Sequence, residues 1–161
     1  MKHIFTFLLL TCLLFGLTGC RISYLEPEEM QEFLNRVVED VGCSQITDDK
    51  DLIGTRYLQN TEDSYAGKYS ADCSHVTGRD VIFGGASINS RELFLSGYIH
   101  PISGKATVRI RLNNEVTELE ADSDGAFETT LKLSSGGNYI MVVYEDFTGI
   151  IEMNCEYIPP R

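Results

Sequence analysis

The sequence predicts a mostly β protein, an antiparallel β-sandwich of about eight strands with one amphipathic helix docked at its N-terminal side. Two observations predict the sandwich. From Tyr65 onward, short segments of alternating apolar and polar residues are separated by turn residues, and two hairpins can be paired so that one face stays apolar. The eight strand segments are 65–73, 80–88, 92–99, 105–112, 115–121, 126–133, 138–145 and 150–158.

A helix is predicted over residues 27–41. Pro27 suits the first helical turn and Gly42 suits the position just after the last one. Apolar residues recur with the helical period and form a single stripe. The stripe consists of Met30, Phe33, Leu34, Val37, Val38 and Val41.

The first hairpin is predicted around a two-residue turn at 113–114. This turn places Val108 opposite Leu119, and Arg109 opposite Glu118. Apolar residues then meet apolar residues, and a positive charge meets a negative one.

The second hairpin is predicted around a three-residue loop at 123–125. In this register Ala121 pairs with Phe127, and Leu119 pairs with Thr129. Both registers keep one face of the sheet apolar, which favours an all-β body.

Two further segments complete the predicted domain. Residues 44–59 are polar and rich in turn formers, so we expect a loop with one short strand within 52–58. The segment 139–144 is apolar on both faces and must therefore be covered twice. The opposite sheet would cover one face, and the helix 27–41 is the large apolar surface left to cover the other.

The N-terminus has the order of a secretory signal: a positive start, a short apolar run over 5–17 and small residues before Cys20. The run is too short to span a bilayer, which takes about 20 residues. The ending Leu17-Thr18-Gly19-Cys20 resembles the lipobox of bacterial lipoproteins. Residues 20–26 are predicted to form a short tether, and residues 27–161 have the length of one domain. The resemblance implies cleavage after residue 19 and lipidation of Cys20. It also implies membrane anchoring on the extracytoplasmic side of a bacterial envelope.

Net charge narrows the classes of partner, and the cysteine positions bear on disulfides and metal sites. Without residues 1–19 the chain has 24 acidic and 12 basic residues, a net charge of −12, which disfavours nucleic acid and anionic headgroups. Cys43 and Cys73 lie at the ends of predicted elements, which favours a disulfide between them, while Cys155 lies in the apolar phase of a strand. No spacing matches a zinc site, and we expect neither a metal nor a cofactor.

The stretch from Ser96 through Gly149 resembles the immunoglobulin-like modules repeated in many bacterial surface proteins. The matching residues include Gly97, the strand 106–110, the turn 122–127 and the segments 131–133, 136–140 and 146–149. The resemblance implies an immunoglobulin-like fold over about 65–158. It also implies a spacing, adhesion or ligand-binding role.

Residues that carry chemistry are sparse in this sequence. His75 and His100 lie in turn contexts, and no nucleophile or metalloprotease motif accompanies them. The acidic turn at 122–125 fails as a calcium loop because Leu131 stands where a glutamate is needed. Tyr57, Tyr65 and Tyr69 are the candidates for contact with a ligand.

The sequence therefore predicts a lipid-anchored, non-enzymatic binding module for a protein, a peptide or a glycan. The alternative is a structural or assembly accessory that pairs an edge strand with a larger envelope complex.

Overall fold

The structure is a computed structural model that describes residues 45–59, 63–87 and 90–159, and all of these belong to one compact unit. The signal segment, Cys20, the tether 20–26, the helix 27–41 and Cys43 lie outside the described residues. What the sequence suggests about them stays a prediction. None of the described helices is both long and apolar enough to span a membrane.

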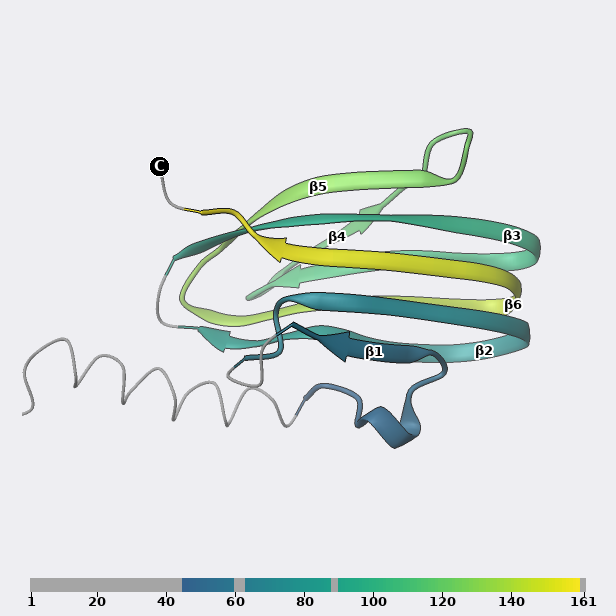
Figure 1. The fold of residues 1–161 in the computed structure, drawn as a ribbon, viewed down its shortest axis with the longest axis horizontal. Coiled ribbons are helices and arrows are strands. Elements are labelled where there is room, and N and C mark those ends of the chain that lie inside the picture. The colour runs from purple at the N-terminus through teal and green to yellow at the C-terminus, as the bar shows by residue number, and fades with distance from the viewer. Residues whose placement is uncertain (1–44, 60–62, 88–89, 160–161) are drawn as a thin grey trace, which may run out of the picture. The chain divides into compact units, whose positions relative to one another are not determined.

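The described residues form a mostly β structure with antiparallel strands, as predicted (Figure 1). Hydrogen bonds order five strands as β1-β2-β6-β3-β4. The sixth strand, β5, pairs with the first half of β3 along the edge opposite β6. A short 3₁₀ helix, η1, precedes the first strand. The elements are η1 (Asp49–Asp51), β1 (Thr55–Leu58), β2 (Gly67–Ser87), β3 (Arg91–Leu112), β4 (Glu115–Leu119), β5 (Ala126–Leu133) and β6 (Gly136–Tyr157).

Three of these strands are more than twenty residues long, and each contains two of the eight predicted segments. The expected turns at 74–79, 100–104 and 146–149 are instead bends inside continuous strands. Register shifts mark these bends, and His75, Gly104 and Asp146 adopt positive φ angles of 54°, 71° and 47° there. A bulge increases local twist and lets a strand turn without breaking its pairing. The described residues therefore form six strands where the sequence suggested about eight.

The bends fold the sheet onto itself as two layers (Figure 1). We call them the five-strand layer and the four-strand layer. The five-strand layer comprises β1, β2 up to Cys73, the end of β6, the start of β3 and β5. The four-strand layer comprises the remaining halves of β2, β6 and β3, together with β4. The finer resemblance to immunoglobulin-like modules stays a prediction.

The core lies between the two layers. Side chains from both of them form one buried cluster, in which the most enclosed are Tyr65, Tyr69, Ile82, Phe83, Leu93, Leu95, Leu133, Val108, Val142, Tyr144, Phe147 and Ile151. Tyr69 from the five-strand layer and Tyr144 from the four-strand layer meet through their hydroxyl oxygens, 2.6 Å apart. The alternating apolar positions of the sequence are thus the interior of the sandwich.

The first predicted hairpin is confirmed. Val108 lies opposite Leu119, and Arg109 lies opposite Glu118. The Arg109 guanidinium donates to the Glu118 carboxylate over 2.6 Å, and this contact lowers the pKa of that carboxyl group.

The second predicted hairpin is wrong. In the structure β5 pairs with β3, so Phe127 lies opposite Gly97 and not opposite Ala121. Residues 120–125 carry the chain from the four-strand layer to the five-strand layer. The alternation of apolar and polar residues fits a hairpin within one layer and a chain that crosses to the other layer equally well. It therefore did not reveal the crossing at 120–125.

The segment before β1 is held against β2 through polar contacts. The Thr47 amide donates to the Val81 carbonyl at 3.1 Å, and the Arg56 guanidinium donates to the carbonyls of Ile82 and Thr47 at 2.8 and 3.0 Å. Asp49 accepts from the same guanidinium at 2.7 Å. The expected loop with one short strand is confirmed as η1 followed by β1.

Candidate groove on the five-strand layer

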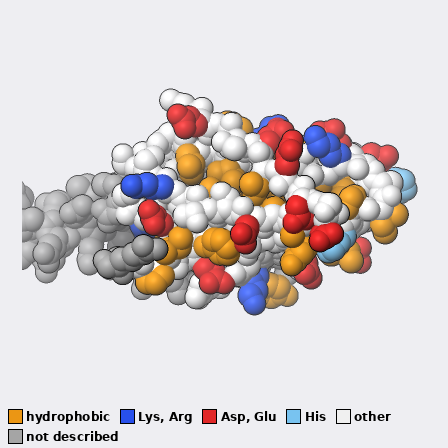
Figure 2. Space-filling view, turned by 90° about the horizontal axis from the view of Figure 1, so that it is seen from above, with side chains coloured by type: hydrophobic (Ala, Val, Ile, Leu, Met, Phe, Trp, Pro, Cys, Tyr) orange, Lys and Arg blue, Asp and Glu red, His pale blue; other side chains and the backbone are white. Residues whose placement is uncertain are grey.

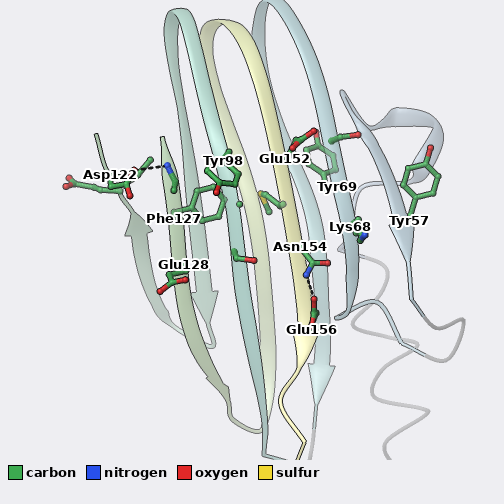
Figure 3. A pocket seen from close by; sticks show the side chains of 17 residues that line it. Tyr57, Lys68, Tyr69, Tyr98, Asp122, Phe127, Glu128, Glu152, Asn154 and Glu156 are labelled. Atoms are coloured by element: carbon green, nitrogen blue, oxygen red, sulfur yellow. Dashed lines mark hydrogen bonds between the residues drawn. The ribbon is translucent and has the colours of Figure 1, made fainter. Parts of the chain in front are cut away.

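A groove of about 1030 Å³ crosses the outer surface of the five-strand layer (Figure 3). All five strand segments of the layer contribute to it, as do residues 120–122 just before β5. Its lining residues are Tyr57, Lys68, Tyr69, Ser70, Ser96, Gly97, Tyr98, Glu120, Ala121, Asp122, Ala126, Phe127, Glu128, Glu152, Met153, Asn154 and Glu156.

The outward side chains of the groove form two rows that run across the strands. Strand register gives the first row as Tyr57, Lys68, Asn154, Ser96 and Glu128. The second row contains Ser70, Glu152, Tyr98 and Ala126 in the same order of strands. Side chains directly opposite on neighbouring strands lie about 5 Å apart. The first row is therefore a strip of polar groups that ends at Tyr57, and the second places Tyr98 beside Glu152.

The two aromatic side chains of these rows are exposed. Tyr57 is 65% exposed and Tyr98 is 48% exposed. They stand on β1 and β3, three strand spacings apart, or roughly 14 Å. Tyr98 stacks on His100, with ring centroids 5.7 Å apart and planes inclined by 7°. The stack fixes the orientation of the Tyr98 ring at its side of the groove.

The outward side chains between the two tyrosines differ in size. Ser70 and Ser96 are small, whereas Lys68, Asn154 and Glu152 also stand between β1 and β3. A Cβ atom on Gly97 would clash with the carbonyl oxygen of Glu152 and with the ring of Phe127. Core packing and the neighbouring backbone therefore dictate a glycine at this position.

The groove is acidic. Its lining contains five carboxylates and the single ammonium group of Lys68. Asp122 is occupied locally, because its carboxylate accepts from the amides of Asp124 and Ala126 at 2.9 Å each. Glu156 accepts from the Asn154 amide. Glu120, Glu128 and Glu152 have no hydrogen bond or ion pair within the described ranges.

Of the three tyrosines predicted to contact a ligand, the structure places only Tyr57 on the surface. Tyr65 and Tyr69 are each 1% exposed and belong to the core. The expectation that these two are surface contacts needs correction. Tyr69, Ala71 and Cys73 share one phase of β2, and that phase is apolar because it faces the other layer. Tyr65 lies two residues before β2 and is buried as well.

Tyr98 was missed by sequence reasoning, although a signal for it existed. It lies in the phase of β3 that also contains Ser96 and His100, while Leu93, Leu95 and Ile99 fill the buried phase. A tyrosine in the polar phase of a strand is expected to be exposed.

Behind the groove, a buried polar cluster joins the two layers. Asp80 is 1% exposed, and its carboxylate accepts from the amides of Ile53 and Gly54 at 2.9 and 3.3 Å. The Tyr69 hydroxyl donates to the same carboxylate over 2.5 Å. Burial is the main cause that raises the pKa of both Tyr69 and Tyr144, so both hydroxyls stay protonated and able to donate.

The cysteines that the structure describes are buried thiols. Neither Cys73 nor Cys155 forms a disulfide with another described residue, and burial raises the pKa of the Cys155 thiol to about 12. The interpretation of Cys155 as a small core residue is confirmed. The disulfide between Cys43 and Cys73 stays a prediction, since Cys43 lies outside the described residues. Across the residues that the structure describes, no three His, Cys, Asp or Glu side chains gather as a metal site.

Comparisons with known proteins give no family for this chain. No protein-family model matches it, and no curated protein matches it. Solved structures similar to it include the carbohydrate-binding module CBM6cm-2 of Cellvibrio mixtus lichenase 5A in complex with cellotriose. That alignment has 7% identity and a TM-score of 0.36, and it covers 74% of this chain and 96% of the module.

Two further similar structures come from carbohydrate-active proteins. The C-terminal CBM6 of LamC from Zobellia galactanivorans aligns at 11% identity and a TM-score of 0.30, covering 71% of this chain and 96% of that one. The GH26-CBM35 β-(1,4)-mannanase of Podospora anserina aligns at 17% identity and a TM-score of 0.34, covering 74% and 27% respectively. TM-scores of this size do not establish a shared architecture, so the ligands of these proteins are not transferred to this chain.

Proposed function

We propose that this protein is a non-enzymatic glycan-binding module, held at a bacterial envelope by lipid on Cys20. The observation that carries the binding function is the open groove with an exposed tyrosine on β1 and another on β3. Tyrosine rings offer an apolar face and a polar tip, which suits a ligand with apolar faces and hydroxyl edges. A chain of sugars has both.

The position of the groove favours a glycan over an extended peptide. A peptide strand adds to a free sheet edge, where backbone donors and acceptors are unpaired. This groove crosses the middle of the layer, where the backbones of β2, β6 and β3 already pair with one another. A ligand there meets side chains only, and sugar hydroxyls can satisfy side chains such as Ser70, Ser96 and Asn154.

The groove geometry favours binding over hydrolysis. Glycoside hydrolysis uses two carboxyl groups around the scissile bond, one of them kept protonated by an apolar environment. Glu128 and Glu152 are both solvent-exposed in an open groove. Neither histidine that the chain retains outside its signal segment lines the groove.

A glycan screen with matched variants tests the proposal. The full chain, purified in detergent, is applied to an array of plant, microbial and host glycans, and affinities for the hits are then measured by calorimetry. We expect Tyr57→Ala and Tyr98→Ala each to weaken binding roughly tenfold, because each removes one stacking surface. The control is Ile102→Ala, which shortens a side chain that is 82% exposed and lies outside the groove. Equal losses in all three variants, or none in the tyrosine variants, would contradict the proposal.

A further inference from the structure

The charges of the groove are unevenly distributed. Lys68 lies next to Tyr57, since these residues are directly opposite on β1 and β2. Glu152 lies opposite Tyr98, and Glu128 lies opposite Ser96 on the neighbouring strand. Carboxylates therefore lie on both strands beside Tyr98, whereas Lys68 lies beside Tyr57 with Glu156 nearby on β6 (Figure 3).

The three carboxylates of Glu120, Glu128 and Glu152 lack a cation within the described part of the chain. Glu128 and Glu152 lie on the two strands that flank β3, at least two strand spacings or roughly 10 Å apart. Together they give this side of the groove a negative potential that favours a ligand of opposite charge. An uncharged sugar can accept or donate hydrogen bonds here but cannot neutralise the carboxylates. A ligand with carboxylate, sulfate or phosphate groups would add to the repulsion.

We infer that the groove binds a glycan that carries protonated primary amines, with an amine held beside Glu152 at the Tyr98 side. The inference rests on the proposed glycan-binding function and specifies its ligand class. Charge complementarity points to the amine, and the exposed ring of Tyr98 points to the sugar ring that bears it. An ammonium next to Glu152 would lie within a few ångströms of the stacked pyranose, because Glu152 and Tyr98 are direct cross-strand neighbours.

The expected preference is moderate, because the groove is open to solvent. An exposed ion pair contributes little by itself, equivalent to roughly a threefold change in affinity. Two or three such contacts together give a preference of about tenfold for the amine. The preference should shrink as salt is added, because ions screen exposed charges over about 10 Å at 0.1 M.

The test compares three hexasaccharides of the same β-1,4 linkage that differ only at carbon 2. The glucosamine hexamer carries an amine there, the N-acetylglucosamine hexamer an acetamide and cellohexaose a hydroxyl. Calorimetry uses the full chain at a pH where the sugar amines are protonated. We expect the glucosamine hexamer to bind about tenfold more tightly than cellohexaose. Glu152→Gln should reduce that preference about threefold.

Glu115→Gln is the charge-matched control, since Glu115 is an exposed carboxylate on β4 outside the groove. Equal affinity for the three hexamers would overturn the inference and leave the glycan function standing. Hexalysine binding that is as tight and is insensitive to Tyr98→Ala would also overturn it, by assigning the effect to surface charge alone. Binding of none of the hexamers would overturn it as well. The proposed function falls only if the broader glycan screen shows no hit that depends on the tyrosines.

Discussion

Replacing Asp80 by asparagine is the sharpest test of how the two layers are held together. The carboxylate is buried and accepts from two backbone amides and from the Tyr69 hydroxyl. Asparagine keeps the shape of the side chain but has one acceptor oxygen and one donor amide. All three donors reach Oδ2, and the Ile53 amide also reaches Oδ1 at 3.1 Å. With the amide oxygen in the Oδ2 place every donor keeps an acceptor, but the NH₂ group faces the Ile53 amide and the bonds lose the charge that strengthens them.

The expected cost of Asp80→Asn follows from two opposing effects. Hydrogen bonds to a charged group contribute about 1.5–3 kcal/mol each, and hydrogen bonds to a neutral acceptor about 0.5–1.5 kcal/mol each. Neutralising a buried charge recovers part of the cost of taking that charge out of water. We expect the losses to exceed the recovery, because three donors converge on one carboxylate. The net destabilisation should be about 3 kcal/mol, which lowers the melting temperature of a domain this size by roughly 12 °C.

Urea unfolding followed by circular dichroism measures this quantity, with the slope of the transition as a check that both variants unfold in the same way. Asp72→Asn is the matched control, because Asp72 is an exposed aspartate on the same strand. A double-mutant cycle with Tyr69→Phe isolates the contact between Tyr69 and Asp80, and we expect a coupling of about 1–2 kcal/mol. Equal or greater stability of Asp80→Asn would refute the reasoning, since it would mean that the cost of burying the charge dominates.

Two further predictions concern the anchor and the buried tyrosines. Cys20→Ala should release the protein from the membrane fraction and abolish its labelling by a fatty-acid analogue; retention of label in the variant would exclude lipidation at this residue. Burial raises the pKa of Tyr144 above the value of about 10 for an unfolded tyrosine, so the stability it contributes is complete below pH ~10 and is lost as pH rises further. Unfolding free energies measured across this range should fall less steeply for Tyr144→Phe, by about 1.4 kcal/mol per pH unit, and an unchanged slope would argue against a protonated Tyr144 in the folded state.

Alternation of apolar residues was enough to locate the strands, because every predicted strand segment lies within or overlaps an observed strand. It also gave the register of Val108 with Leu119, where a two-residue turn fixes the pairing. It could not reveal that segments such as 92–99 and 105–112 belong to one strand. The residues between them have the composition of a turn, and whether such residues end a strand or bend it depends on pairing with distant segments.

The acidic surface of the protein is the clearest chemical feature that the sequence revealed, but its concentration in a groove was not visible. Glu128 and Glu152 are 24 positions apart and become neighbours of one shallow cavity only because β5 and β6 both pair with β3. The sheet order that brings them together depends on the crossing at 120–125, which local patterns did not predict. A site assembled from several strands can be predicted only when the order of those strands in the sheet is known.

β1 links the buried polar cluster around Asp80 to the proposed binding groove. Thr55, the first residue of β1, follows directly after the two residues whose amides are held by Asp80, and Tyr57 lies two residues further along. Beyond its ladder to β2, this short strand is positioned by the buried carboxylate and by Arg56. Tyr57 is therefore attached to the least extensively paired strand of the groove, whereas Tyr98 stands on a strand paired on both sides. Measured well below the melting temperature, Asp80→Asn should weaken glycan binding when Tyr57 is present. In a Tyr57→Ala background the same substitution should change the affinity little. Equal losses in both backgrounds would show that Asp80 supports the whole layer and does not act through β1.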